Sequence, residues 1–163
     1  AILVFDEGTD HVCRFGGKCD ITQPLNHVSN VALIELLDTT DIWTCQYCVH
    51  ENASLLLERK FVFFRELFAS ARDGSLFLFT DTSHRLWPVL LDISLPHGYE
   101  VAFIHGHGRW KAGYQMVLRK GQQGSVTNAD LELCEQFRRD AEMHQRKLAH
   151  GYKRPKRRVP EQR

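Results

Sequence analysis

Side chains able to bind ligands or move protons gather at the end of an apolar run within the segment Asp41-Ile-Trp-Thr-Cys-Gln-Tyr-Cys-Val-His-Glu51. About thirty residues later a second apolar run, Gly74-Ser-Leu-Phe-Leu-Phe-Thr-Asp81, ends in an acid. Ligand crevices of open parallel sheets lie beyond the carboxyl ends of the strands. We therefore expect the ends near Gln46 and Asp81 to be neighbours in a βαβ unit and to open onto a shared cleft.

The polar residues after the first run allow more than one chemistry. His50 and Glu51 would form an acid/base pair for a substrate proton. Alternatively, Glu51 marks the turn from strand to helix and His50 packs beneath it. The pair Cys45 and Cys48 suggests a zinc or redox site, but residues three apart on an extended strand point to opposite faces. We expect buried apolar cysteines and no metal site.

A second group of candidates lies in the segment His105-Gly-His-Gly-Arg-Trp110. His105 and His107 would need cysteine partners to bind a metal, and no second pair is suitably spaced. Trp110 lies between Arg109 and Lys111, a setting that suits stacking on a base or a substrate ring. Packing within a surface loop is the alternative for this tryptophan.

The periodicity of apolar residues predicts an α/β chain. A loop or hairpin is expected over 9–18. Continuous apolar strands, typical of a sheet covered on both faces, are expected over 1–5, 42–49, 75–79, 99–104 and 114–118, the last two antiparallel. Helices are expected over 28–37, with an apolar stripe at 28, 31, 34 and 37, over the segment between Asn52 and Asp73, with a stripe at 57, 61, 64, 68 and 71, and over 84–93 and 127–150.

Composition limits the class of protein. A chain of 163 residues with 43% hydrophobic residues suits one globular domain. No apolar run is long enough to cross a bilayer, so we expect no membrane partner. The chain opens in mid-strand without a signal sequence, and we expect a piece of a longer protein. Five cysteines without a regular framework indicate a reduced intracellular setting, nuclear or cytoplasmic.

The C-terminal end differs in charge from the rest of the chain. The last twenty residues contain eight Lys or Arg and one acid, although the formal net charge is only +1. From Gly151 onward the composition predicts disorder. The run Lys153-Arg-Pro-Lys-Arg-Arg158 would bind polyphosphate such as RNA, and it also fits a nuclear import signal. A solvated, disordered end without a partner is the alternative.

Three of these segments together resemble a known family. The segment 41–51 is similar to the fourth-strand motif of Rossmann-like (class I) S-adenosylmethionine-dependent methyltransferases, an Asp, an apolar strand, then Tyr-x-x-His-Glu. The segment from Phe64 to Asp81 is similar to the family's crossover helix, glycine turn and fifth strand. The run Tyr114-Gln-Met-Val-Leu-Arg119 is similar to its antiparallel closing strand. The resemblance covers roughly residues 19 to 120, the C-terminal two-thirds of such an enzyme.

The resemblance implies S-adenosylmethionine as cofactor and assigns roles to particular residues. Asp20 would accept a hydrogen bond from the adenine amino group, and Ile21 would pack on the adenine ring. Gln46 and Tyr47 would line the floor near the methionine portion and the methyl acceptor. The expected cofactor-binding set is Asp6, Glu7, Asp20, Ile21, Gln46 and Tyr47, with Asp6 or Glu7 on the ribose. The expected substrate-binding set is His50, Glu51, Asp81 and Trp110.

Each of the acidic assignments has a simpler alternative. Asp20 would serve to cap or turn the chain before Pro24, and Asp6 and Glu7 would be ordinary solvated residues at a strand end. The chain also departs from the family, because Asp6-Glu-Gly-Thr-Asp10 replaces its glycine-rich loop. Only thirteen residues separate Asp6 from Asp20, too few for the expected helix and return strand.

We therefore expect a Rossmann-like, mostly parallel sheet with an antiparallel closing strand that lacks its first βα unit. The expected organisation is a methyltransferase-type domain over 1–125, a helix over 126–150 and a basic tail over 151–163. The expected function is methyl transfer, with RNA as the acceptor class suggested by the tail, and no catalytic residue is evident. The alternative is a non-catalytic relative that binds a protein or nucleic acid. Other α/β enzymes are disfavoured because the sequence has no phosphate loop, Gly-x-Ser-x-Gly elbow or dinucleotide fingerprint.

Overall fold

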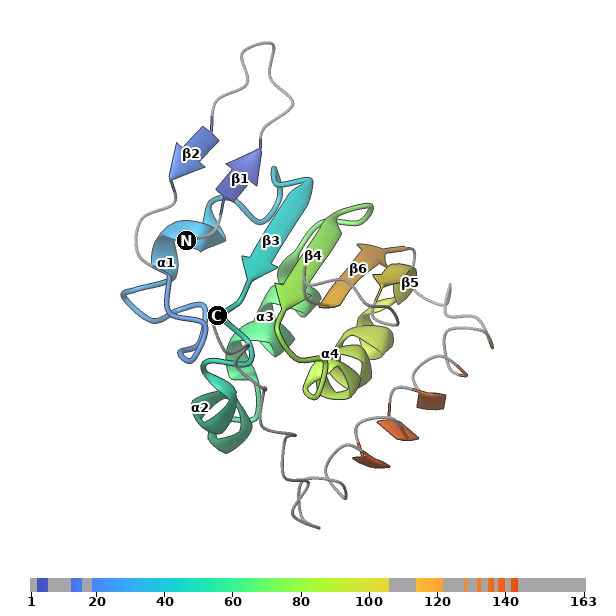
Figure 1. Ribbon diagram of the computed structural model, residues 1–163. Coiled ribbons are helices and arrows are strands. Elements are labelled where there is room, and N and C mark those ends of the chain that lie inside the picture. The colour runs from blue at the N-terminus through green and yellow to red at the C-terminus, as the bar shows by residue number, and fades with distance from the viewer. Residues whose placement is uncertain are drawn as a thin grey trace, which may run out of the picture.

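The architecture was analysed in a computed structural model (Figure 1). The structure describes residues 19–105 and 114–121, the backbone of 3–5 and 13–15, and eight single positions between 128 and 143 whose backbone is helical. Side chains are described for 19–102 and 114–121 and for those single positions. The expected helix over 127–150 is therefore seen only at isolated positions, and the basic tail over 151–163 lies outside the described residues.

A mixed four-stranded sheet forms the centre of the fold. Its strands are β3 (Ile42–Gln46), β4 (Leu76–Asp81), β6 (Tyr114–Lys120) and β5 (Tyr99–His105), in the order β3-β4-β6-β5. β3 and β4 are parallel, whereas β6 is antiparallel to both β4 and β5 (Figure 1). The α/β class and the antiparallel closing pair are thus confirmed.

The connection between the parallel strands is helical, as a parallel pair requires. It contains two helices, α2 (Ala53–Glu58) and α3 (Val62–Ser70), where the sequence predicted one. The break falls at Lys60 and Phe61, which both adopt left-handed backbone with φ of 54° and 56°. This turn directs Phe61 into the core, where its side chain is buried. Leu57, expected on the buried stripe, is instead 53% exposed.

Aromatic packing joins α3 to one face of the sheet. The ring of Phe68 lies 5.1 Å from that of Phe77 on β4 and 4.9 Å from that of Tyr99 on β5, and Phe64 lies 5.8 Å from Phe79. Along β4 the buried positions alternate with half-buried ones, as the period of an extended strand dictates. Helix α4 (Trp87–Ser94), followed by the 3₁₀ helix η1 (Leu95–His97), packs beside α3 and completes this core.

The first strand does not join the four-stranded sheet. β1 (Leu3–Phe5) and β2 (Cys13–Phe15) pair antiparallel in a separate two-stranded sheet, drawn beside β3 in Figure 1. The segment 9–18, expected as a loop or hairpin, thus contributes β2, the second strand of a hairpin whose first strand is β1. The seven residues between β1 and β2 are too few for a parallel crossover but ample for a hairpin loop.

The helix expected over 28–37 is mostly replaced by turns. Only α1 (Val31–Ile34) is helical, and the predicted apolar stripe is wrong at three of its four positions. Val28, Val31 and Ile34 are 83%, 51% and 43% exposed, whereas Leu33 and Leu37 are buried. Among the described residues, no helix is long and apolar enough to cross a membrane.

A buried ammonium group closes the end of α3. Lys120 on β6 is 8% exposed, and its Nζ donates hydrogen bonds to the carbonyl oxygens of Phe68 and Ala69, each at 3.1 Å, and of Ala71. The last carbonyls of a helix have no partner within the helix and carry its negative dipole end. Burial lowers the pKa of Lys120, and the charge of Asp73 opposes that effect.

We expect Lys120→Met to lower the free energy of unfolding by about 2–3 kcal/mol, because it leaves several buried carbonyls without donors. Chemical denaturation followed by circular dichroism measures this. The matched control is Arg119→Met, which removes an exposed pair with Glu100 and is expected to cost less than about 1 kcal/mol. Equal losses in the two variants would contradict the structural role of Lys120.

Candidate functional site

Two backbone N–H groups after β3 donate hydrogen bonds that hold the carboxyl ends of β3 and β4 together. The N–H of Tyr47 donates to the carbonyl oxygen of Thr80 at 2.7 Å, and the N–H of His50 donates to Oδ2 of Asp81 at 2.8 Å. These ends are therefore neighbours, as predicted. Asp81 itself is 2% exposed and lines neither of the two cavities described below. The structure gives it the role of a buried acceptor that fixes the turn after β3.

A cavity of about 210 Å³ lies beside the end of β3. One wall is the segment Cys19–Ile21, and the other is formed by the end of β3 and the turn that follows it. The residues lining this cavity are Cys19, Asp20, Ile21, Thr44, Cys45, Gln46, Cys48 and Asn52. Three of the six expected cofactor residues, Asp20, Ile21 and Gln46, thus lie around one space.

One oxygen of the Asp20 carboxylate, Oδ1, is occupied by hydrogen bonds within the protein. This oxygen accepts hydrogen bonds from the N–H of Thr22 at 2.9 Å and from the Thr22 hydroxyl at 2.7 Å. These bonds lower the pKa of Asp20 below its usual value. The turn-forming role considered for this residue is therefore confirmed for Oδ1. Within the described residues, Oδ2 accepts no hydrogen bond, and Asp20 is one of the residues that line the cavity.

Asp20 is held in place by a buried side chain, that of Asn30, which the sequence analysis did not identify. Asn30 is fully buried, and its Oδ1 accepts the N–H of Asp20 at 2.8 Å. Its Nδ2 donates to the carbonyl oxygens of Asp20, Gln23 and Pro24 at 2.9, 3.1 and 3.0 Å. An asparagine ten residues after Asp20 is a weak sequence signal, because the same residue is common in exposed turns.

The same wall is tied to the crossover helices. Nη1 of Arg59 donates to the carbonyl oxygen of Thr22 at 3.1 Å, and the N–H of Leu25 donates to Oε2 of Glu66 at 2.7 Å. Through these bonds the segment after Asp20 is held against α2 and α3. Both walls of the cavity are therefore anchored to the βαβ unit.

The two cysteines of this site face one another. Sγ of Cys45 lies 2.7 Å from Sγ of Cys48, so the prediction that they point to opposite faces is wrong. β3 ends at Gln46, and Tyr47 takes a left-handed conformation with φ of 57° that brings Cys48 back toward Cys45. An extended strand does not reach Cys48, and the rule for alternating faces does not apply to it.

The thiols of the cavity differ in acidity. The hydrogen bond with Cys45 lowers the pKa of Cys48, and the same bond together with burial raises the pKa of Cys45. Burial raises the pKa of Cys19 to about 12. Cys48 is thus the thiol of this group that most readily becomes a thiolate, the form that reacts as a nucleophile.

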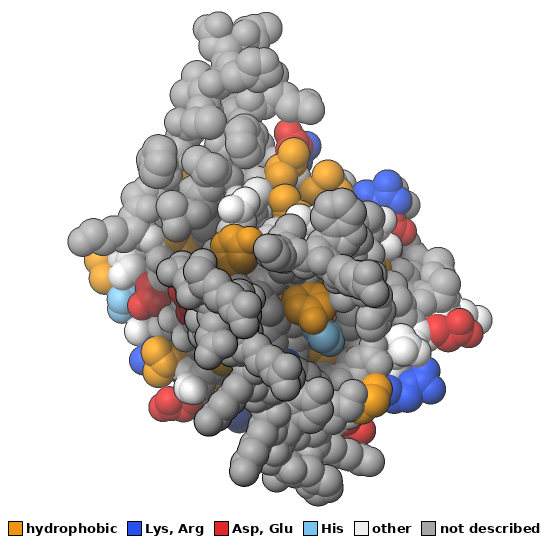
Figure 2. All heavy atoms as spheres, viewed as in Figure 1, with side chains coloured by type: hydrophobic (Ala, Val, Ile, Leu, Met, Phe, Trp, Pro, Cys, Tyr) orange, Lys and Arg blue, Asp and Glu red, His pale blue; other side chains and the backbone are white. Residues whose placement is uncertain are grey.

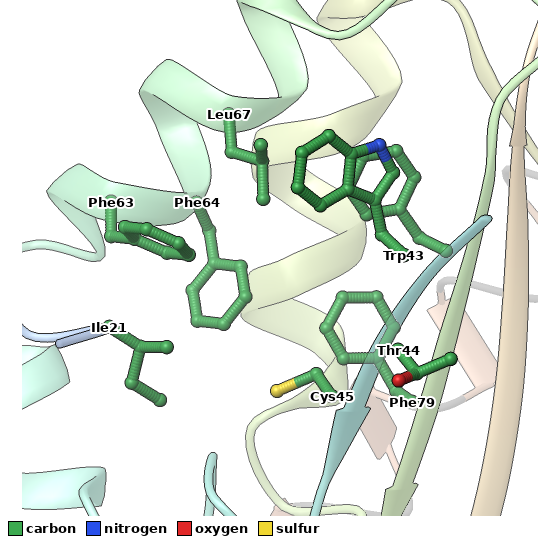
Figure 3. A pocket seen from close by; sticks show the side chains of 9 residues that line it. Ile21, Trp43, Thr44, Cys45, Phe63, Phe64, Leu67 and Phe79 are labelled. Atoms are coloured by element: carbon green, nitrogen blue, oxygen red, sulfur yellow. The ribbon is translucent and has the colours of Figure 1, made fainter. Parts of the chain in front are cut away.

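A second cavity lies between the sheet and α3. It measures about 20 Å³ and is enclosed by apolar side chains, among them Trp43, Phe63 and Phe79 (Figure 3). Three residues, Ile21, Thr44 and Cys45, line both cavities. A space this small and apolar is a packing defect of the core and not a ligand site.

The other site residues predicted from the sequence do not line this cavity or lie outside the described residues. Tyr47 is 42% exposed and does not line it, and neither do the exposed His50 and Glu51. Asp6, Glu7, His107 and Trp110 lie outside the described residues. Among the residues that the structure describes, no group of three His, Cys, Asp or Glu side chains is placed to hold a metal ion.

Comparison with known proteins assigns neither a family nor a function to the chain. No protein-family model matches the chain, and a search of curated proteins finds no significant match. Function must therefore be argued from the cavity and the residues around it.

We expect Asn30→Ala to lower the free energy of unfolding by about 2–4 kcal/mol, because it removes both bonding ends of a buried amide. Thermal or urea unfolding measures the loss. Asn26 is an exposed residue of the same type in the same segment, and Asn26→Ala is expected to change stability by less than about 0.5 kcal/mol. A loss in Asn30→Ala no larger than that of the control would contradict the anchoring role.

The acidity order predicts the pH dependence of alkylation. We expect the rate at Cys48 to rise with a midpoint below the usual thiol pKa, and Cys19 to react only at much higher pH. The buried Asp81 carboxylate opposes the lowering at Cys48, and removal of the Cys45 thiol in Cys45→Ala should therefore raise the Cys48 midpoint. Iodoacetamide rates resolved by peptide mass spectrometry measure both. A Cys48 midpoint that Cys45→Ala leaves unchanged would exclude the thiol hydrogen bond as the cause.

Proposed function

We propose that this chain is a methyltransferase-type domain that binds S-adenosylmethionine at the 210 Å³ cavity. The observation that carries the proposal is the convergence of Asp20, Ile21 and Gln46, from two distant segments, on one cavity beyond a parallel strand end. Crevices at this edge of a parallel sheet are the usual ligand sites of open α/β folds.

The chemistry of the lining suits a nucleoside. The available Oδ2 of Asp20 would accept the adenine amino group, and the apolar side chain of Ile21 would pack on the ring. Gln46, exposed at the end of β3, would hydrogen-bond the polar end of the cofactor. Ligand pockets commonly measure about 300–1,000 Å³, so the cavity fits the adenine end of the cofactor better than the whole molecule.

The topology gives separate support. β6 runs antiparallel between β4 and β5, as the resemblance to the methyltransferase closing strand implies. The strand order β3-β4-β6-β5 differs from the dinucleotide-binding order, so a Rossmann-like sheet without its first βα unit is a proposal and not a finding.

In the proposed reaction the protein acts by positioning the cofactor and the methyl acceptor. When bound, the cofactor supplies an activated methyl group, and the protein has to hold the acceptor in line with it. Asp20 and Ile21 would fix the nucleoside, while the rigid turn at Tyr47 would fix Gln46 relative to it. Because the cofactor supplies the reactive methyl group and the protein only positions it, no dedicated nucleophile is needed.

RNA as the methyl acceptor rests on the basic run over 153–158 alone. On the face shown in Figure 2, Lys and Arg side chains alternate with Asp and Glu around the rim of the described part. A mixed surface of this kind gives little attraction for polyphosphate. The proposal of an RNA acceptor therefore depends on the tail and not on the described residues of this face.

The alternative function is that of a non-catalytic relative which keeps the sheet and binds a partner. The observation that favours it is the acidic segment Asp6–Asp10 in place of a glycine-rich loop, because close approach of the backbone to a cofactor usually requires glycine.

Isothermal titration calorimetry with S-adenosylmethionine and S-adenosylhomocysteine tests the proposal. Asp20→Asn is the informative variant, because its amide oxygen can keep the bonds to Thr22 while its NH₂ group replaces the free acceptor. We expect Asp20→Asn to weaken binding about tenfold, the effect of one lost hydrogen bond. Asp38→Asn removes an exposed charge elsewhere and should bind like the parent chain.

An analogue with hypoxanthine in place of adenine sharpens this test. Its carbonyl oxygen on C6 accepts a hydrogen bond where the adenine amino group donates one, so Asp20→Asn should bind it better than the parent does. If the folded parent chain binds neither cofactor form at millimolar concentration, the non-catalytic alternative is favoured. If binding occurs but Asp20→Asn leaves it unchanged, the assigned role of Asp20 is wrong.

A further inference from the structure

Three of the cysteines that the structure describes line a single cavity. Cys19 belongs to one wall, and Cys45 and Cys48 belong to the other. The sulfur atoms of Cys45 and Cys48 are 2.7 Å apart, whereas no sulfur contact joins either of them to Cys19 in the described part of the chain. The cavity therefore contains one facing pair of thiols and one separate thiol.

The backbone keeps the pair in this arrangement. The left-handed Tyr47 lies between the two cysteines, and its N–H is bonded to Thr80. On the other side of Cys48, the N–H of His50 is bonded to the buried Asp81 carboxylate. Asn52 adds a bond from Nδ2 to the Cys48 carbonyl oxygen at 2.8 Å. A turn fixed at both ends holds the thiols close without a covalent link.

The two thiols also differ in acidity, and both border the cavity. Cys48 and Cys45 are both partly exposed and border a cavity of about 210 Å³. The pKa of Cys48 is lowered and that of Cys45 is raised, by the hydrogen bond between them. Thiol–disulfide exchange begins with attack by a thiolate and is completed by a neighbouring thiol, and this pair meets both conditions.

We propose that Cys45 and Cys48 form a redox-active dithiol, which small-molecule disulfides entering the cavity oxidise to an intramolecular disulfide. Cys48 is the attacking sulfur and Cys45 the resolving sulfur, while Cys19 takes no part. The assignment is independent of the proposed methyl transfer, because it needs no cofactor and uses none of the atoms assigned to cofactor binding.

The exchange is balanced with oxidised glutathione as the oxidant. The Cys48 thiolate attacks one sulfur of the glutathione disulfide, the S–S bond breaks, and one glutathione thiolate leaves. The Cys45 thiol then loses its proton, and its sulfur attacks Cys48 in the mixed disulfide, releasing the second glutathione. The protein gives up two electrons and two protons, and one disulfide is reduced to two thiols.

The full-length chain tests this in buffers of fixed reduced-to-oxidised glutathione ratio. After equilibration the chain is unfolded in denaturant so that every remaining thiol is alkylated, and mass spectrometry locates the disulfide. Trypsin leaves Cys19, Cys45 and Cys48 on one peptide, so chymotrypsin is added to separate Cys19 from the pair. We expect a Cys45–Cys48 bond to appear and to disappear reversibly with the buffer ratio, while Cys19 stays alkylated throughout.

Variants assign the roles. Cys19→Ser should form the bond as the parent does, Cys45→Ser should accumulate glutathione on Cys48, and Cys48→Ser should show neither product. A parent chain whose Cys45 and Cys48 remain fully alkylated in pure oxidised glutathione would overturn the proposal. A disulfide that includes Cys19, or glutathione that accumulates on Cys45 in Cys48→Ser, would overturn the assignment as well.

Discussion

The bond between the buried Asp81 carboxylate and the His50 N–H is the constraint on which the site depends. Parallel strands bring their ends to one edge, but they do not decide what the chain does after it leaves the sheet. Asp81, at the end of β4, holds the chain that follows β3 and so stabilises the left-handed backbone at Tyr47. A conformation that costs roughly 1 kcal/mol for a residue with a side chain persists only when its surroundings fix it. The cavity wall and the facing thiols both follow from this turn.

The second wall is independent of that turn and is organised by a different buried polar group. Asn30 binds the chain on both sides of Ile21, and Arg59 and Glu66 attach the same segment to the crossover helices. These helices are held in turn by the aromatic rings of α3 against β4 and β5 and by Lys120 at the end of α3. The cavity thus lies between the irregular segment after Cys19 and the end of β3 with the turn that follows it, and a buried polar side chain fixes each of these walls.

The sequence predicted the sheet far better than it predicted these segments. Apolar runs such as 76–79 allow little but a buried strand, and the closing antiparallel pair follows from its short connection. The stripe at Val28, Val31 and Ile34 misled because these side chains face outward, whereas Leu33, Leu37 and the polar Asn30 are buried. Alternation along a strand likewise gave the wrong geometry for Cys48, because the strand ends two residues earlier. Asp20 and Gln46 were placed near one another only through the resemblance, since no local pattern relates residues so far apart.

The two chemistries proposed for the cavity use different physical properties of its walls. Nucleoside recognition requires an unpaired acceptor beside an apolar surface, and the Asn30-anchored wall supplies both through Asp20 and Ile21. Disulfide exchange requires two sulfurs held close with unequal acidity, and the Asp81-anchored turn supplies these through Cys45 and Cys48. The two walls are held by separate buried groups. A substitution that loosens one wall therefore leaves the other wall in place. A cavity built in this way can keep one of its chemistries even where a substitution has removed the other.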